Sequence, residues 1–284
     1  MRWSAGGEER LAAATRARRE ATLYWQLAVA GFRRQSQYKL AMFAGLFTNC
    51  VFGLVRAAVM LAAVRSAGDF GGYDEGTMGA YVWLSQGLLG AMQFMGPPLE
   101  LVDRVKNGDI AIDFLRPVDI QLSYLAADLG RATCTLVPRF LPSVLFGFLT
   151  VGLAMPATPG PYVLGVISIV LAVALSFLML FAIGLIGFWV VETRGIRVLY
   201  QICGTFLAGL FVPVHMFPDW LRTLAYATPF PSILQAPIDV LSGRILGVEA
   251  VTVVGAQLFW VLTIAAIGRL MLAAGRRRLE VQGG

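Results

Sequence analysis

The sequence predicts an all-α integral membrane protein, and three observations support this class. Hydrophobic residues make up 57% of the 284 residues, charged residues only 14%, and the mean hydropathy is +0.71. Soluble domains average about 45–50% apolar and about 25% charged residues. Six stretches are long enough to cross a bilayer, and they are apolar all round, which favours helices over the alternating strands of a barrel. We expect six spans, near 40–64, 78–99, 124–152, 162–191, 197–213 and 251–273.

The positions of Lys and Arg predict that both chain termini are cytoplasmic. Basic residues gather before the first span, after the second, around Arg194 and after the last, whereas the expected external loops hold only Arg65, Arg222 and Arg244. Positive residues stay on the cytoplasmic side of a membrane, so this pattern favours six crossings over five or seven. The net charge of +6 then reflects topology and attraction to lipid headgroups, with no nucleic acid partner required.

One membrane domain accounts for the chain. We expect a cytoplasmic leader over 1–39, a six-helix domain over 40–273 and a basic cytoplasmic tail over 274–284. In the leader, Trp25 and Phe32 lie on one face of an amphipathic helix over 20–38, which either anchors the chain on the inner leaflet or offers a docking surface.

Two segments outside the spans stand out. Residues 100–123 are cytoplasmic and polar, with a short charged helix that stops at Asn107 and Gly108 and a second short element after it. Such a segment either transmits a push from a cytoplasmic partner or is an ordinary solvated loop. Residues 213–250 are broken by prolines but are too apolar for a free external loop, so we expect short re-entrant helices in the outer leaflet.

Motifs for catalysis are absent from the sequence. It contains no GxxxxGK[ST] phosphate loop, so we expect no ATP hydrolysis by this chain. His215 is the only histidine and has no ligand cluster at metal-binding spacing, and Ser176 has no neighbouring base. We therefore expect no catalytic residue, no metal and no cofactor in this chain. Cys50, Cys134 and Cys203 fall in expected spans and are interpreted as buried thiols.

Charged side chains inside the spans are candidates for a substrate pathway, because each costs about 2.5–3.5 kcal/mol at the bilayer centre. Arg56 and Arg139 could line a route for an amphiphilic or anionic substrate. Alternatively, Arg56 snorkels to the outer headgroups, and Arg139 bonds the carbonyls freed by Pro138 and Pro142.

Small residues at intervals of four predict close helix packing, either at a subunit interface or within one chain. The candidate dimer-interface residues are Gly45, Asn49, Gly53, Gly204 and Ala208.

The pattern resembles the permease subunits of bacterial type-2 ATP-binding cassette (ABC) exporters. The string NGDIAIDFLRPVD resembles a signature of one branch of that family, through Gly108, Leu115, Arg116 and Pro117. FPDWL (217–221) and TPF (228–230) resemble the outer segment of the family. The resemblance covers most of the chain from about residue 20.

The resemblance implies a half-transporter in the bacterial inner membrane. It implies a second permease chain, either a related non-identical subunit or a second copy, and two cytoplasmic ATPase subunits that hold ATP and magnesium. The cargo would be a drug, antibiotic, peptide, lipid or glycan, moved outward. The residues expected to couple to the ATPase are Asp103, Arg104, Lys106, Asn107, Gly108, Asp109, Asp113, Leu115, Arg116 and Pro117.

Two other functions stay open. An ion-driven secondary transporter would need buried acidic groups, but Asp128 and Glu192 lie at span edges. An intramembrane transferase would need clustered aspartates, whereas Asp103 and Asp119 mark the ends of a set spread through one loop.

Overall fold

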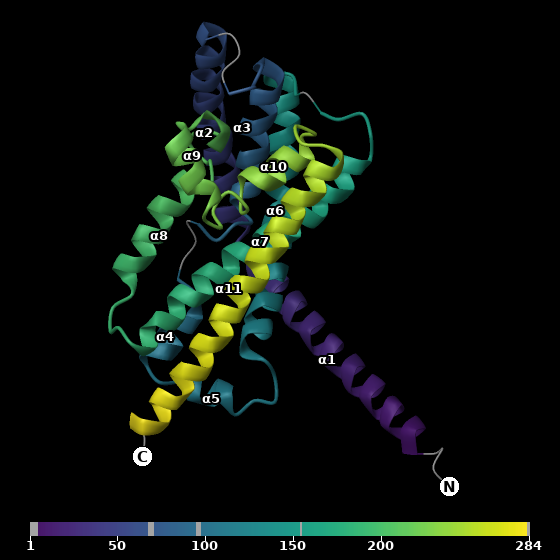
Figure 1. Ribbon diagram of the computed structural model, residues 1–284, viewed down its shortest axis with the longest axis vertical. Coiled ribbons are helices and arrows are strands. Elements are labelled where there is room, and N and C mark those ends of the chain that lie inside the picture. Colours follow the sequence, from purple (N-terminus) through teal and green to yellow (C-terminus); the bar gives the residue numbers. More distant parts are fainter. Residues whose placement is uncertain (1–4, 68–70, 95–97, 154, 283–284) are drawn as a thin grey trace.

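The computed structural model in Figure 1 describes residues 5–67, 71–94, 98–153 and 155–282, and within these ranges the chain is helical without strands. The predicted all-α class is confirmed. The first four residues of the leader, including Arg2, lie outside the described part. The helices are α1 (Ala5–Ser36), α2 (Lys39–Ala67), α3 (Glu75–Leu89), α4 (Glu100–Lys106), α5 (Ile110–Phe114), α6 (Ile120–Thr150), α7 (Gly160–Leu185), η1 (Ile186–Phe188), α8 (Arg194–Leu207), η2 (Val214–Met216), α9 (Asp219–Tyr226), α10 (Gln235–Leu241) and α11 (Gly247–Gln282).

Four helices in the described part are long and apolar enough to cross a membrane, namely α2, α6, α7 and α11. The other two expected spans differ from the prediction. α3 has 15 residues and ends at Leu89, and α8 has 14 and ends at Leu207. At about 1.5 Å per residue neither covers the roughly 30 Å of a hydrocarbon core alone. The six-crossing topology therefore stays a prediction.

The start and the end of α3 have different causes. Asp74 caps its start, accepting a hydrogen bond from the Thr77 amide at 2.8 Å. At its end, Arg131 of α6 donates to the Ala91 carbonyl at 2.9 Å and to Asp128 at 2.6 Å. Gln93 donates to the same carboxylate at 2.6 Å. In a continuing helix, the Ala91 carbonyl would accept a hydrogen bond from a backbone amide one turn later. Because Arg131 supplies this donor instead, the helix can end inside the bundle.

α7 is the central helix, and α11, α10 and the short α4 pack around it (Figure 1). On the other side of the bundle, α1 crosses α6 where two glycines remove side chains from the contact. A Cβ at Gly130 would lie 1.8 Å from the Ala28 carbonyl oxygen, and one at Gly31 would lie 2.0 Å from that of Ala127. The backbones therefore touch, and the angle between leader helix and bundle depends on these two positions.

The outer segment between α8 and α11 is fixed by a buried polar cluster around Gln235, which starts α10. Its Oε1 accepts from the Val214 amide at 2.9 Å and lies 2.8 Å from the Tyr81 hydroxyl. Its Nε2 donates to the Tyr73 hydroxyl at 3.1 Å and to Asp239 at 2.8 Å. We call Gln235, Asp239, Tyr73, Tyr81 and Val214 the outer cluster.

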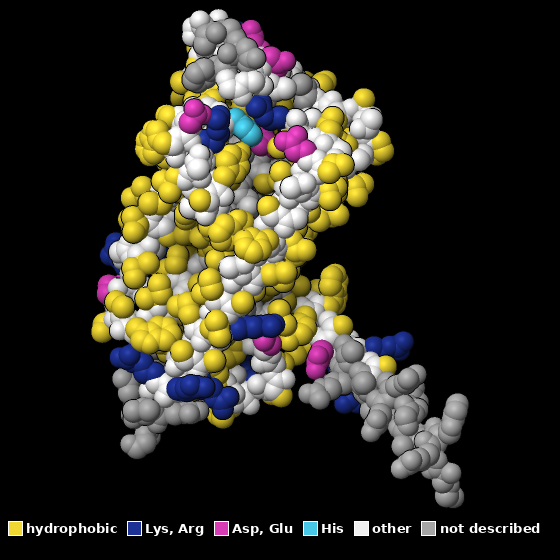
Figure 2. Space-filling view, viewed as in Figure 1, with side chains coloured by type: hydrophobic (Ala, Val, Ile, Leu, Met, Phe, Trp, Pro, Cys, Tyr) yellow, Lys and Arg dark blue, Asp and Glu magenta, His cyan; other side chains and the backbone are white. Residues whose placement is uncertain are grey.

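His215 and Arg244 extend the outer cluster. His215 is in η2, and its Nε2 lies 2.9 Å from Asp239. The Arg244 guanidinium stacks 3.8 Å from the Tyr73 ring centre and donates to the carbonyls of Gly71 and Gly72. The segment is thus a cap bonded to the loop before α3. Figure 2 shows His215, in cyan, beside Lys and Arg side chains at this end.

Adding one carbon at Gly130 should separate α1 from α6. We expect Gly130→Ala to destabilise the purified chain by about 1–3 kcal/mol, because the new Cβ meets a backbone carbonyl that cannot rotate away. Thermal unfolding in detergent measures the effect. Gly255→Ala is the matched control, since its Cβ meets nothing within 4 Å. Equal unfolding temperatures for the two variants would show that the crossing tolerates a side chain.

Candidate coupling surface and buried membrane charges

The segment between α3 and α6 is packed onto the membrane helices through an apolar face. Leu101 and Val105 of α4 and Ile110 of α5 are buried in a cluster with Phe181 and Leu185 of α7. α4 ends at Lys106, as the predicted helix stop requires, and Gly108 has a φ of 80°, which a side chain would disfavour. Of the two interpretations left open, a fixed element fits this packing better than a solvated loop.

An ion pair holds α4 to α5. Arg104 donates to both carboxylate oxygens of Asp113, at 2.7 and 2.9 Å, and Arg116 approaches the same carboxylate at 3.5 Å. The Asp113 side chain is only 8% exposed. The hydrogen bond to this carboxylate raises the pKa of Arg104 above its ordinary value, so the guanidinium stays charged. Arg104 and Asp113, expected to face the ATPase, are therefore engaged with each other within the segment.

Two exposed ion pairs connect α4 to its surroundings. Arg34 of α1 donates to Glu100, and the hydrogen bond lowers the pKa of that carboxyl. Lys106 lies 3.8 Å from Glu192, in the turn before α8. Exposed ion pairs contribute at most about 1 kcal/mol each to the free energy of folding, so these two pairs orient α4 more than they stabilise it. They place α4 between the leader helix and the start of α8.

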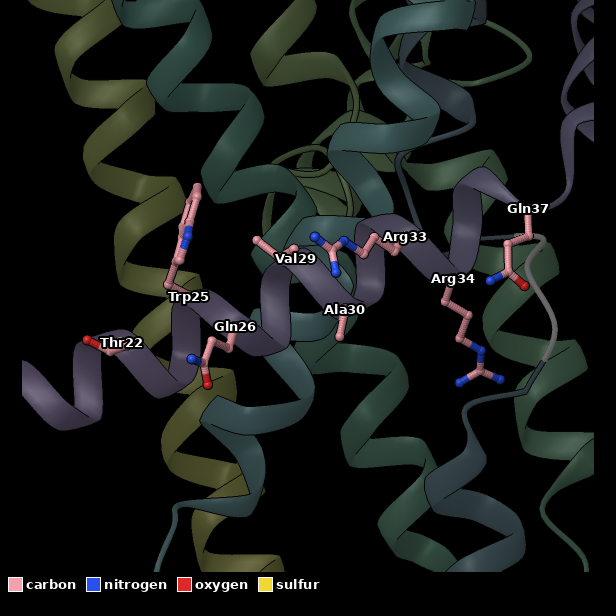
Figure 3. A pocket seen from close by; sticks show the side chains of 8 residues that line it. All are labelled: Thr22, Trp25, Gln26, Val29, Ala30, Arg33, Arg34 and Gln37. Atoms are coloured by element: carbon pink, nitrogen blue, oxygen red, sulfur yellow. The ribbon is translucent and has the colours of Figure 1, made fainter.

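The leader helix presents two different sides next to this segment. In Figure 3, Trp25 and Val29 project to one side of α1, and Gln26 and Arg34 project to the other. Trp25 is 70% exposed, as expected for a helix that lies in a membrane interface. A shallow groove of about 680 Å³ follows this helix, lined by Thr22, Trp25, Gln26, Val29, Ala30, Arg33, Arg34 and Gln37.

The remaining expected coupling residues lie on the surface. Leu115, which follows α5, is 85% exposed. Beside it, a groove of about 430 Å³ between α5 and α11 is lined by Phe114, Leu272, Ala273, Arg276 and Arg277. The other exposed residues of this set are Asp103, Lys106, Asn107, Asp109, Arg116 and Pro117.

Arg56 of α2 does not snorkel outward. Its Nη1 donates to Ser85 of α3 at 2.6 Å, and its guanidinium lies 5.8 Å from the Tyr81 ring centre. Its Nε and Nη2 are buried without a hydrogen-bond partner among the described residues. The side chain is thus turned into the bundle with unused donors.

Arg139 of α6 does not bond the carbonyls that its neighbouring prolines free. The side chain extends between two glycines: a Cβ at Gly45 would lie 2.2 Å from its Nη2, and one at Gly90 would lie 2.5 Å from its Cδ. Its Nε is buried and unpartnered, and no ion pair or hydrogen bond to it is formed within the described chain. The two glycines create the space in which this cation sits.

The small-residue stripe is occupied within the chain. Asn49 is buried and donates to the Gln86 carbonyl of α3 at 3.0 Å, and a Cβ at Gly53 would meet Trp83 at 2.8 Å. Gly204 faces Phe230 and Phe94, and Ala208 is fully buried. This packing, together with Gly45 beside Arg139, favours the intrachain alternative over a dimer interface at these positions.

Sequence reasoning missed two groups of polar residues. The outer cluster joins residues more than 150 positions apart, and its only local signal is Gln235 and Asp239 at i and i+4 in an apolar segment. The pair of Asp128 and Arg131 at i and i+3 was visible, but its role at the end of α3 was not. All three cysteines are free, and Cys134 is buried as expected. The expected burial of Cys50 and Cys203 is wrong, because both are partly exposed.

Comparison with known families agrees with this architecture. The profile described as ABC-2 family transporter protein matches residues 52–283, which is most of the chain. No curated protein matches the chain significantly. A chain of apolar helices that carries this profile is a multi-pass membrane protein and a transport subunit that is not catalytic by itself. The chain therefore belongs to the ABC-2 family of transporter proteins, as a permease.

Proposed function

We propose that this permease is the membrane subunit of a bacterial ABC exporter, driven by two separate cytoplasmic ATPase subunits. The observation that carries the proposal is the construction of α4 and α5. They form one body through the Arg104–Asp113 pair, they are packed on α7 through Leu101 and Val105, and they expose charges on the other side. α4 and α5 can transmit a displacement to α7, because the ion pair between them and their buried contacts with α7 make the three helices move together.

The path of the displacement follows from the contacts. A push on α4 reaches α7 through the apolar cluster, α1 through Glu100 and the turn before α8 through Lys106. α5 passes the same push to the cytoplasmic end of α11, where Arg276 lies 5.8 Å from the Phe114 ring centre. ATP-driven closure of the ATPase pair would thus move several membrane helices at once and release cargo outward. ATP and magnesium belong to the partner in this arrangement.

The proposal includes a second permease chain and a cytoplasmic position for both termini. A related, non-identical chain is our preferred partner, with a second copy as the alternative. The exposed apolar surface that covers the middle of the molecule in Figure 2 offers room for it and for lipids. The pairing of Asp128 with Arg131 and Gln93 argues against an ion-driven carrier, because this buried carboxylate already has its counter-charge.

Reversing exposed charges on the coupling segment should weaken recruitment of the ATPase. We expect Asp103→Lys combined with Asp109→Lys to reduce the ATPase retained in a pull-down about tenfold, since reversed contacts of this kind change binding by the order of 1–2 kcal/mol. The unfolding temperature should stay unchanged, because both residues are exposed. Asp219→Lys is the control, on an outer side chain that is 91% exposed. Full retention by the double variant would contradict the assigned docking face.

Arg104→Glu should behave differently from the exposed variants. It leaves the buried Asp113 beside a second negative charge, so we expect a loss of stability of up to about 3 kcal/mol in the permease alone. The exchange of Arg104→Asp with Asp113→Arg should recover part of the loss. Thermal unfolding without ATPase is the measurement, and an unaffected Arg104→Glu variant would show that the pair does not hold α4 to α5.

The proposed orientation can be tested with single cysteines in a chain whose three native cysteines are replaced by serine. Asp219→Cys in α9 should react with an impermeant maleimide added to intact cells, whereas Asp109→Cys should react only after the cells are opened. Both positions are exposed, so access alone decides the result. Labelling of Asp109→Cys in intact cells would reverse the orientation and remove the basis for cytoplasmic ATPase docking.

A further inference from the structure

We propose that Arg56 and Arg139 form two subsites for the negatively charged head of an amphiphilic substrate, with Arg139 beside Gly45 near the start of α2 and Arg56 just past the middle of that helix. This inference rests on the proposed transport function and names the substrate class that the function leaves open. The shared chemistry is a phosphate or carboxylate group attached to an apolar body.

The first argument is the absence of counter-charge. Arg131, in the same bundle, is bonded to Asp128 and to two carbonyls, which is how membrane proteins normally neutralise an internal cation. Arg56 has only the Ser85 hydroxyl and the Tyr81 ring, and Arg139 has neither a hydrogen bond nor an acidic partner in the described chain. An internal guanidinium with unused donors requires an anion to complete it.

The second argument is the alignment of the two cations. The Arg139 guanidinium lies beside Gly45, and Arg56 is on the same helix eleven residues further along. Eleven residues correspond to about 16 Å along the axis and to a rotation of only about 20° around it. Both positive charges therefore follow one flank of α2, in the order in which a substrate crossing the membrane would meet them.

The third argument is the apolar surface that follows the same flank. Phe52 lies four residues before Arg56 and Val59 lies three residues after it, and their side chains are 65 and 57% exposed. Side chains at these spacings share one side of a helix with Arg56. A ligand that pairs with the guanidinium can lay an alkyl or aromatic body on this strip, which a small inorganic ion cannot use.

Binding of radiolabelled dodecyl phosphate to the full chain in phosphatidylcholine nanodiscs tests the inference, with empty nanodiscs subtracted. We expect saturable binding to the wild type, and about tenfold to hundredfold weaker binding to Arg56→Gln and to Arg139→Gln. Arg56→Lys and Arg139→Lys should keep most of the affinity. Dodecyl maltoside and inorganic phosphate should compete poorly, because each lacks one half of the ligand.

Arg65→Gln is the matched control, since it removes one exposed charge from the same helix and should bind as the wild type does. Unchanged affinity in both glutamine variants overturns the proposal, as does binding that depends only on the alkyl chain. If inorganic phosphate competes as well as dodecyl phosphate does, the apolar body is not recognised and the proposed amphiphilic substrate class is wrong. If Arg56→Gln fails to fold, Arg139→Gln and the two lysine variants still decide the outcome.

The assay contains no ATPase, so it separates this inference from the function on which it rests. A chain that recruits the ATPase but does not distinguish dodecyl phosphate from dodecyl maltoside would remove the subsites alone. A chain that binds the anion through both arginines but never recruits an ATPase would remove the proposed exporter alone.

Discussion

The hydrogen bonds of Arg131 at the end of α3 determine how the rest of the chain is arranged. Within a bilayer, backbone groups that leave a helix must find partners in the protein. Arg131 supplies donors to the Gly90 and Ala91 carbonyls, and Asp128 balances its charge while accepting from Gln93. α3 can therefore end inside the bundle, and the next helix, α4, packs on α7.

Long hydrophobic runs predicted the four long helices, because an apolar stretch in lipid must satisfy its own backbone groups. The predicted boundaries of α2 and α6 agree within four residues, whereas α7 ends six residues before the predicted end at 191 and α11 continues nine residues beyond the predicted end at 273. The ends of α3 and α8 could not be predicted in this way. α3 ends because of the Arg131 side chain on α6, about forty positions away, and the residues of α3 alone do not predict that contact. The break at Asn107 and Gly108 was predictable, because the required positive φ is a local property of glycine.

The candidate residues show the same division between local and distant causes. The charged character of the α4–α5 segment was evident, but the assignment of Arg104 and Asp113 to each other depends on how Gly108 folds one short helix against the next. The glycine stripe on α2 was correctly recognised as a place of close approach, although its occupant is Trp83 of the same chain. The spacing of small residues predicts that a helix packs against this side of α2, but only the three-dimensional structure identifies which helix it is.

The outer cluster has a consequence for how this protein can diverge. Gln235 satisfies groups contributed by three other segments, so a lone replacement there strands several polar atoms, and neighbouring positions must change in concert. The flank of α2 is less constrained, because Nε and Nη2 of Arg56 and Nε of Arg139 have no hydrogen-bond partner among the described residues. Substitutions along this flank of α2 can therefore accumulate while the outer cluster stays unchanged.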